Sequence, residues 1–355
     1  MSILGRYLIR TVLSTTLLVL LVLLAIAGFV EFVAQLDDVG EGDFTVRSAL
    51  LYAVLRLPLL AAQMVPVAAL IGALLGLGQL ASQSELTVMR AAGVSKRQLA
   101  ATIATSGLAL TFATIVIGEY LAPPLDQFAR TYRASLKRGG DSAAAEGNVW
   151  VRDGNTVYNI ERLGGQLNLG RVYRFDFDEN QELTAVGYAQ NGGLDVNERW
   201  LLDNFVATHF DGDGTYVEAE AQSVQGLSID ADVLGVALIR PTSMSLRSLH
   251  AYIGYLSDNG LRADAYLSEY WSRIATLVAI VLMPVLAIGF VFGSLRDAGN
   301  GARTLVGVMI GLAWYLATRL LSNSGQVFDL NIVLTAWIPS IVLALITLIA
   351  VSRVR

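Results

Sequence analysis

Two arginines after the third long apolar run have the spacing of an anion site. Arg130 and Arg133 lie three residues apart, so a helix would present both on one face, with Lys137 next in line. Paired guanidinium groups bind phosphate or carboxylate bidentately, whereas a lysine ammonium acts as a point charge. Asp126 could instead pair with Arg130 at a spacing of four residues, which would make a local ion pair.

Arg319 is expected within an apolar layer or at its outer rim. The uncharged residues 304–318 separate it from Arg303. As a helix they cover about 22 Å, which is less than the roughly 30 Å of a bilayer's hydrocarbon core. A charge at that depth indicates a lumen, a partner charge or a ligand. The alternative is that the side chain extends to the outer headgroups.

Glu31 and Arg56 occupy the outer ends of the first two apolar runs. They could form a mutual ion pair or line a cavity, and the sequence does not decide between these alternatives. The predicted charged site consists of Glu31, Arg56, Arg130, Arg133 and Arg319.

A polar stretch, residues 82–99, separates the second and third apolar runs. The pairs Ser82/Glu85 and Ser95/Gln98 have the spacing of capping boxes, which predicts two helix starts. The first helix is expected over about 83–93 and is short. It could lie in the lipid headgroups as an interfacial helix, or it could dock a cytoplasmic partner through its apolar face. That face consists of Leu86, Met89 and Arg90 with Val88 and Ala92, and Glu85 lies at its tip. Gly93 can turn left-handed past the helix end.

The composition excludes several kinds of chemistry. The chain has no cysteine and two histidines, which excludes disulfides, thiolate metal sites and a histidine-built zinc centre. Its two lysines, Lys96 and Lys137, belong to no GxxxxGK[ST] loop, so ATP should not bind in that way. We therefore expect no catalytic residues, no metal site, no cofactor of the chain's own and no nucleic-acid partner.

Six apolar segments are long enough to position these residues in a membrane. Of the 355 residues, 54% are hydrophobic and 15% charged, with a mean hydropathy of +0.55. A membrane span needs about 20 mostly apolar residues. The expected spans are 11–30, 57–80, 99–118, 274–295, 304–321 and 332–351. The chain is therefore predicted to be a polytopic α-helical membrane protein, with three spans before a polar insert and three after it.

Basic residues in the short loops predict the orientation, since such loops stay in the cytoplasm. They gather before span one, between spans two and three, before span five and at the end of the chain. The acidic residues Asp37, Asp38, Glu41 and Asp43 follow span one on the other side. Both termini and the 83–93 helix are therefore expected in the cytoplasm, with the insert on the far side.

The insert changes from helical to strand periodicity. Tyr173, Phe175 and Phe177 alternate with polar residues, and turn signals such as Asp153-Gly154 recur at short spacing. This pattern predicts an all-β domain of the sandwich or jelly-roll type. The expected domains are 1–138 with spans one to three, 139–240 as the β jelly roll, 241–271 as a connector helix and 272–355 with spans four to six.

Several stretches of the sequence resemble a known family. They are RYLIRTVLSTT, ALLYAVLRLP, GALLGLGQLASQSELTVMRAAGVSKRQL and GEYLAPPLDQFARTYR. Together with the three-plus-three layout around a β domain, they resemble the LptF/LptG (YjgP/YjgQ) permease family over essentially the whole chain, and LptG more than LptF.

The resemblance implies a non-catalytic subunit of an ABC transporter that extracts lipopolysaccharide from the outer leaflet of the Gram-negative inner membrane. In this family an LptF-type and an LptG-type subunit pair, and an LptB dimer binds ATP and Mg and hydrolyses the ATP. LptC adds a periplasmic domain and a span, and LptA continues a periplasmic bridge towards the outer membrane. The resemblance thus places the β domain in the periplasm.

The resemblance also implies roles for the two groups of residues. By this resemblance the coupling helix that contacts LptB would carry Glu85, Leu86, Met89, Arg90 and Gly93, and the five charged residues would line the lipopolysaccharide cavity. One departure is visible, because enterobacterial LptG sequences carry lysines near the outer end of span one, where this chain has Glu31, Asp37 and Asp38. A phosphate clamp would then depend on other residues or on the partner subunit.

A function from another class is a secondary transporter, or a membrane-anchored periplasmic binding module without an ATPase. A secondary transporter is expected to show inverted repeats and midplane ionisable groups, and the sequence shows no clear internal repeat. A binding module would not need six spans.

Overall fold

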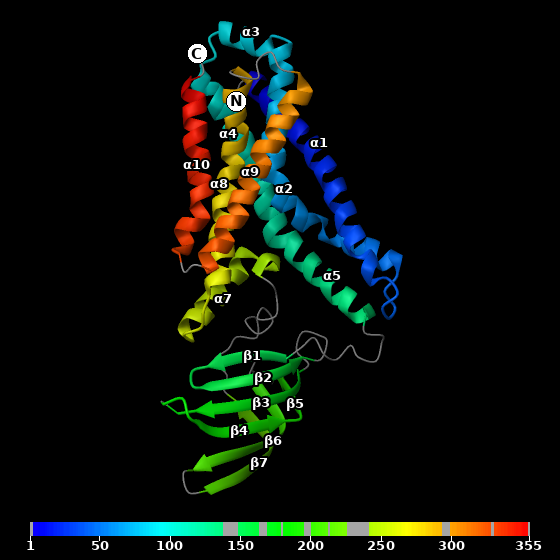
Figure 1. Ribbon diagram of the computed structural model, residues 1–355, viewed down its shortest axis with the longest axis vertical. Helices are drawn as coiled ribbons and strands as arrows, with labels where there is room; N and C mark the ends of the chain where they lie inside the picture. Colours follow the sequence, from blue (N-terminus) through cyan, green and yellow to red (C-terminus); the bar gives the residue numbers. More distant parts are fainter. Residues whose placement is uncertain are drawn as a thin grey trace.

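The structure is a computed structural model that describes residues 3–137, 148–162, 169–178, 180–194, 200–211, 214–225, 241–292, 299–327 and 330–353. A bundle of long helices is followed at one end by a curled β-sheet (Figure 1). We call the end of the bundle nearest the sheet the sheet end. The other is the α3 end, where the short helix α3 lies and where α1 begins and α10 ends (Figure 1).

Six helices or helix runs in the described residues are long and apolar enough to cross a membrane, which confirms the predicted six spans. They are α1 (Ile3–Ala34), α2 (Val46–Ser82), α4 (Lys96–Val116) continued by α5 (Ala122–Lys137), α8 (Asp264–Phe292), α9 (Asn300–Val327) and α10 (Ile332–Arg353). A π-helical segment, η2 (Ile117–Leu121), joins α4 to α5. Pro123 and Pro124 come one residue later, in the first turn of α5, and cannot donate to carbonyls four residues earlier, which accounts for the irregular turn at this point.

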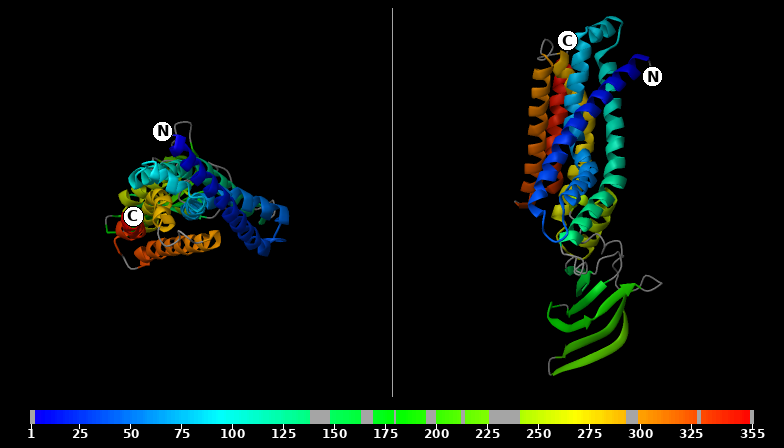
Figure 2. Two further views of the ribbon diagram at one scale, coloured as in Figure 1. Left: turned by 90° about the horizontal axis from the view of Figure 1, so that it is seen from above. Right: turned by 90° about the vertical axis from the view of Figure 1, so that its right-hand side faces the viewer.

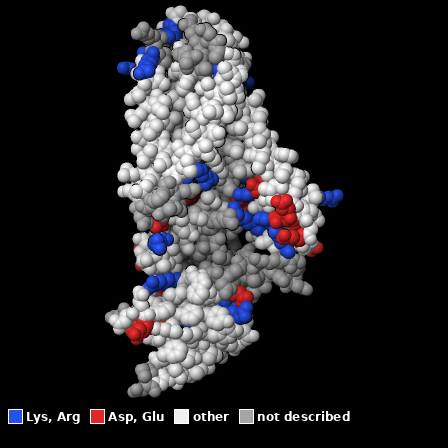
Figure 3. Space-filling view, viewed as in Figure 1, with Lys and Arg blue, Asp and Glu red and all other residues white. Residues whose placement is uncertain are grey.

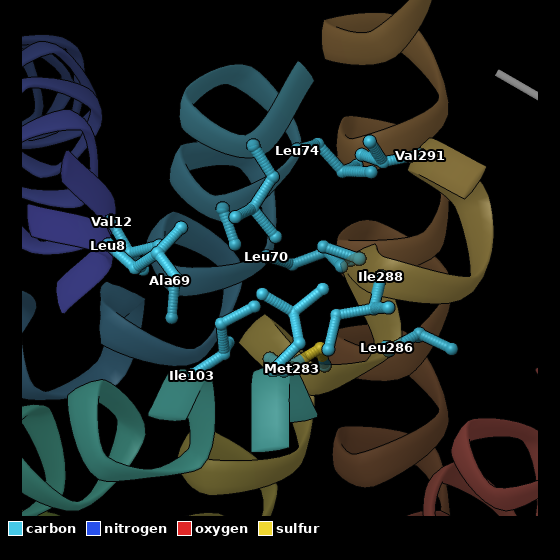
Figure 4. Close-up of a cluster of buried hydrophobic side chains, with 14 of the residues drawn as sticks. Leu8, Val12, Ala69, Leu70, Leu74, Ile103, Met283, Leu286, Ile288 and Val291 are labelled. Atoms are coloured by element: carbon cyan, nitrogen blue, oxygen red, sulfur yellow. The ribbon is translucent and has the colours of Figure 1, made fainter. Parts of the chain in front are cut away.

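Helix α2 forms the centre of the bundle. Its side chains Leu70 and Leu74 meet Met283 and Ile288 of α8 in the main buried cluster (Figure 4). By contrast, α1 and α9 are the least buried spans, and they lie on different sides of the bundle in the view from above (Figure 2). Both therefore expose long apolar faces.

Small residues bring the helices close together, as expected where helix association depends on packing rather than on water exclusion. A Cβ on Gly72 of α2 would lie 2.4 Å from the Thr16 Cα atom of α1. The neighbouring Thr15 hydroxyl donates a hydrogen bond to the Gly72 carbonyl at 2.8 Å. Helices α1 and α2 are therefore in backbone contact at this point.

Arg303, which the sequence places in a basic flank, is buried in the bundle. Only 2% of the residue is exposed. Its side chain lies on Gly78 of α2, where a Cβ would be 2.6 Å from the Arg303 Cδ atom. The α3 end of α9 is therefore fixed against α2 by a buried arginine.

The described residues of the insert between positions 148 and 225 form β-strands and their turns, in agreement with the predicted β domain. Its strands are β1 (Asn148–Asp153), β2 (Thr156–Arg162), β3 (Leu169–Phe177), β4 (Leu183–Ala189), β5 (Asn191–Leu194), β6 (Trp200–Asp211) and β7 (Gly214–Gln225). All the strand pairs are antiparallel, in the order β1-β2-β3-β4-β6-β5 with β7 on β6. The described strands form one curled sheet, a half-barrel, around a core that includes Ile160, Val172 and Leu202. The predicted boundaries at 138/139 and 240 fall outside the described residues.

A connector returns the chain from the sheet to the bundle. It consists of the short η4 (Pro241–Ser243) and of α7 (Leu246–Asp258), which the Ser245 side chain caps by accepting from the Ser248 amide at 3.0 Å. Helix α8 then begins at Asp264, so the fourth span extends well before its apolar segment.

Candidate functional site

Charged side chains of both signs gather where α1, α2 and α5 approach the sheet end. An uncharged band separates them from the basic residues at the α3 end (Figure 3). The structure brings four of the five predicted site residues into this region, in two ion-pair networks, and places the fifth, Arg319 of α9, in the wall of a separate pocket.

The first network is centred on a fully buried carboxylate. Asp126 of α5 has a side chain that is 0% exposed, and it accepts from Arg56 Nε at 2.9 Å and Arg130 Nε at 2.7 Å. Arg56 also pairs with Glu31 of α1. The local Asp126–Arg130 pair considered from the sequence is therefore present, and so is the Glu31–Arg56 ion pair. Two acids and two bases link three helices.

The second network is more exposed. Asp38 pairs with Arg133 and with Lys137 Nζ at 2.8 Å, and Lys137 also reaches Glu41 at 2.6 Å. Again two bases face two acids. The Arg130/Arg133 face is thus not an open cationic fork, because each guanidinium already pairs with a carboxylate of this chain.

A tyrosine ring connects the two networks. The guanidinium carbons of Arg56 and Arg133 each lie 5.6 Å from the centroid of the Tyr52 ring. Cation–π contacts of this kind favour keeping the charge beside the ring. Tyr52 is 2% exposed and offered no sequence signal, because it is one aromatic residue within an apolar run.

A pocket of about 490 Å³ opens between α2, α4, α8, α9 and η4. Arg319 lies on its wall and forms no ion pair with any residue that the structure describes; its guanidinium is 5.8 Å from the Tyr315 ring centroid. Three more charged residues line the pocket, namely Glu119, Glu269 and Arg273. Sequence reasoning missed these three.

Arg273 fixes η4 to the bundle. Its Nη2 atom donates to the carbonyl oxygens of Pro241 at 3.1 Å and Thr242 at 2.8 Å, and its Nη1 atom donates to the Met244 carbonyl. Its Nε atom donates to Glu269 at 2.8 Å. The four-residue spacing of Glu269 and Arg273 is a sequence signal for their ion pair, but nothing in the sequence indicates the backbone carbonyls that Arg273 binds.

Glu119 fixes the next segment. Its carboxylate accepts from the Leu246 amide at 2.7 Å, which is one of the donors left without a partner at the start of α7. A carboxylate at a helix N-terminus is also favoured by the helix dipole. We call Glu119, Glu269 and Arg273 the clasp, since they hold η4 and α7 against α8 and η2.

Helix α7 in turn contacts the sheet. The Tyr255 hydroxyl donates to the Arg152 carbonyl at 2.9 Å and accepts from the Arg152 amide at 3.1 Å. The Asn259 side chain accepts from the Gly154 amide at 3.2 Å. Burial raises the pKa of Tyr255 above its usual value, so the hydroxyl stays protonated at neutral pH. The clasp, α7 and the β1–β2 hairpin therefore form one connected path.

Helix α3 (Glu85–Ala91) lies at the opposite end of the bundle. The predicted Ser82/Glu85 capping box is wrong. Helix α2 continues to Ser82, whose hydroxyl donates to the Gln79 carbonyl. The residue before α3 is Ser84, which has φ 61° and makes no side-chain cap. The Ser95–Gln98 box is confirmed in both directions, at 3.2 and 3.0 Å. Gly93 has φ +94°, as a left-handed turn requires.

The apolar side of α3 faces its own chain. Leu86 and Met89 are 1% and 8% exposed in the main core, so the interpretation that they form an outward apolar face is corrected. The Tyr7 hydroxyl of α1 hydrogen-bonds the Glu85 carboxylate. The Arg90 guanidinium carbon lies 5.6 Å from the Phe292 ring centroid of α8. These contacts leave Val88, 66% exposed, with Thr87 and Ala91 as the outer face.

The described residues contain no group of three or more His, Asp or Glu side chains that could hold a metal ion. The chemistry at both ends is that of ion pairs, hydrogen bonds and packing.

Known proteins resemble this chain over its whole length. Residues 6–353 match the family model described as lipopolysaccharide export system permease LptF/LptG. The permease protein LptG of Escherichia coli K12 is 33% identical over 356 residues, 99% of this chain and 98% of that protein. LptG of Haemophilus influenzae is 30% identical over 99% of both chains. LptF of E. coli K12 is 32% identical over 45% of this chain and 44% of its own length. The chain belongs to the LptF/LptG family of lipopolysaccharide export system permeases.

Proposed function

We propose that this chain is an LptG-type permease subunit that exports lipopolysaccharide, driven by ATP hydrolysis on a separate LptB-type subunit. The observation that carries the proposal is similarity to two LptG proteins along nearly the whole chain, which includes the six spans as well as the sheet. The sequence has no phosphate loop of the Walker type, which is consistent with an energy source on another chain.

The proposed assembly follows the family. An LptF-type subunit pairs with this chain, an LptB dimer with ATP and Mg lies against the α3 end, and LptC and LptA extend the path from the sheet. The α3 end is then cytoplasmic and the sheet is periplasmic in a Gram-negative inner membrane. The distribution of basic and acidic residues between the two ends supports this orientation.

Helix α3 is suited to transmit force, because its inner contacts are already made. Glu85 is tied to α1, while Leu86 and Met89 are embedded in the core. A push on its exposed face would therefore move α1, α2 and α8 together rather than displace α3 alone. We propose that the ATPase contacts this face around Val88, while Glu85, Leu86, Met89, Arg90 and Gly93 set the helix's position.

For the substrate, Arg319 differs from the other three arginines of the predicted site. Arg319 forms no ion pair among the described residues, whereas Arg56, Arg130 and Arg133 do. We propose that Arg319 meets a lipid A phosphate directly. The other three would engage phosphate by exchange, Arg56 releasing Glu31, Arg130 releasing Asp126 and Arg133 releasing Asp38. The exchange is easiest for Arg133, whose side chain is 33% exposed.

The test is Val88→Glu in the complete transporter, reconstituted in vesicles with lipopolysaccharide. We expect ATP-driven lipopolysaccharide release to be lost while the permease stays folded, because the change spares every inner contact of α3. Val46→Glu is the matched control: Val46 is 52% exposed and begins α2 at the sheet end. Normal release by Val88→Glu with the complex intact would contradict the docking face. Purification of an active exporter with no soluble ATPase would favour a secondary transporter or a binding module instead.

A further inference from the structure

The pocket beside the clasp lies entirely within this chain. Its walls come from α2, α4, η2, α8 and α9, with η4 at one side, and its volume is about 490 Å³. That volume falls within the range of roughly 300–1,000 Å³ typical of ligand sites. No partner subunit is needed to form it.

Several hydroxyl groups of the pocket wall are already used. Ser272 and Ser322 hydrogen-bond each other at 2.7 Å, and Thr318 donates to the Trp314 carbonyl at 2.9 Å. Thr276 donates to the Ser272 carbonyl at 2.7 Å. Residues whose polar atoms are paired in this way present mainly carbon to a ligand. The buried Trp314 Nε1 atom forms no hydrogen bond within the described residues, so the wall is mainly apolar and keeps one free donor.

The charged groups of the wall are also used, with one exception. Glu119 accepts from the α7 amide, and Glu269 and Arg273 pair with each other. Arg319 has no ion-pair partner among the described residues. The chemistry of the wall thus matches an apolar tail with one anionic group beside Arg319.

A glycine on the wall faces empty space. A Cβ added to Gly118 of η2 would meet no heavy atom within 4 Å. The other wall residues near it include Ile115 and Leu59, which are apolar. A larger side chain at Gly118 therefore has room to enter the pocket without disturbing the backbone.

We propose that this pocket is a lipid site that holds one fatty acyl chain, with the phosphate of the same lipid at Arg319. The phosphate and chain could belong to a bilayer phospholipid or to lipopolysaccharide, which share this chemistry; only the second source rests on the proposed function. Since Glu119 and Arg273 line the pocket and also hold α7 and η4 respectively, an occupied pocket would brace the connector that carries the sheet.

The test uses Trp314 as a reporter, because it lies in the pocket wall and is 7% exposed. The other four tryptophans are replaced by Phe in the full chain, and the protein is placed in bilayer discs containing phosphatidylglycerol with brominated acyl chains. Bromine quenches indole fluorescence at contact. We expect loss of most of the Trp314 emission relative to discs of unbrominated lipid.

Pocket-filling variants decide whether the quencher is inside. Gly118→Leu, and independently Ala62→Leu, should restore the emission. Gly254→Leu on α7 is the matched control, since a Cβ there also meets nothing within 4 Å and Gly254 is not in the pocket wall. Equal quenching in the filled variants would mean that bromine reaches Trp314 from the surrounding bilayer, and it would overturn the proposal. Absence of quenching in the parent protein would overturn it as well.

Two further measurements identify the headgroup and the source. Arg319→Gln should raise the fraction of brominated lipid needed for half-maximal quenching, and an unchanged fraction would overturn the role given to Arg319. Unbrominated lipopolysaccharide, added next, relieves the quenching if it is the occupant and leaves it unchanged if a phospholipid is. Neither result depends on ATP-driven release, so the site and the export function can fail separately.

Discussion

Asp126 is the residue whose neutralisation should disturb the sheet end most. Its fully buried carboxylate accepts from Arg56 and Arg130, and no other acid reaches Arg130 in the described residues. Removing one partner of a buried ion pair costs about 3–5 kcal/mol. Arg56 keeps Glu31, and the Arg130 side chain is 30% exposed and can hydrate. We therefore expect Asp126→Asn to lower the free energy of unfolding by about 2 kcal/mol.

Glu41→Gln is the matched control, because it also removes one carboxylate from an ion pair. The Glu41 side chain is 57% exposed and lies 2.6 Å from Lys137. Exposed pairs contribute about 0.2–1 kcal/mol, so its effect should be clearly smaller. The assay is reversible unfolding in mixed detergent micelles, followed by circular dichroism. A double variant, Asp126→Asn with Arg130→Gln, should lose less than the sum of the single changes. Equal losses for Asp126→Asn and Glu41→Gln would refute the assignment of a buried, coupled network.

Three further predictions concern the path to the sheet and the core of the sheet. Arg273→Ala should broaden the distribution of distances between spin labels placed on α8 and on the sheet. The sequence has no cysteine, so cysteines introduced for labelling react specifically. An unchanged distribution would argue against the clasp. Tyr255→Phe should speed hydrogen exchange at the Arg152 amide, which loses its acceptor, as mass spectrometry would reveal. Burial raises the pKa of Tyr158 to about 12, so the native state keeps this proton longer than the unfolded state does. The stability contributed by the protonated Tyr158 hydroxyl is therefore complete below the ordinary pKa of 10.0 and is lost as pH rises towards 12. Tyr158→Phe should reduce this loss of stability at alkaline pH, measured by unfolding at a series of pH values.

Local signals predicted the features that close within a few residues. The Ser95–Gln98 box, the left-handed Gly93 and the Asp126–Arg130 pair each involve residues no more than four apart. Hydropathy predicted the six spans for a similar reason, since each span satisfies its backbone hydrogen bonds internally. These parts of the fold depend little on what lies next to them.

Long-range pairing explains what the sequence did not reveal. Arg56 meets Asp126 across 70 residues, and Glu119 caps a helix 127 residues away. Nothing in a single sequence identifies such partners. The failed box at Ser82 has a different cause: α2 includes Ser82 as its last residue, so Ser82 cannot cap a new helix. The free energy gained by capping a new helix at Ser82 is smaller than that gained by packing the last turn of α2.

The joined helices α4, η2 and α5 also have a mechanical consequence. They run without a break for 42 residues, from Lys96 to Lys137. At 1.5 Å per residue their contour length is about 63 Å, so a tilt of about 5° at one end would displace the other by about 5 Å. The π turn lies where such a lever would flex. A small rotation beside α3 would thus produce a larger displacement at Arg130 and Arg133. The stiffness of residues 117–121 determines what fraction of that displacement is transmitted.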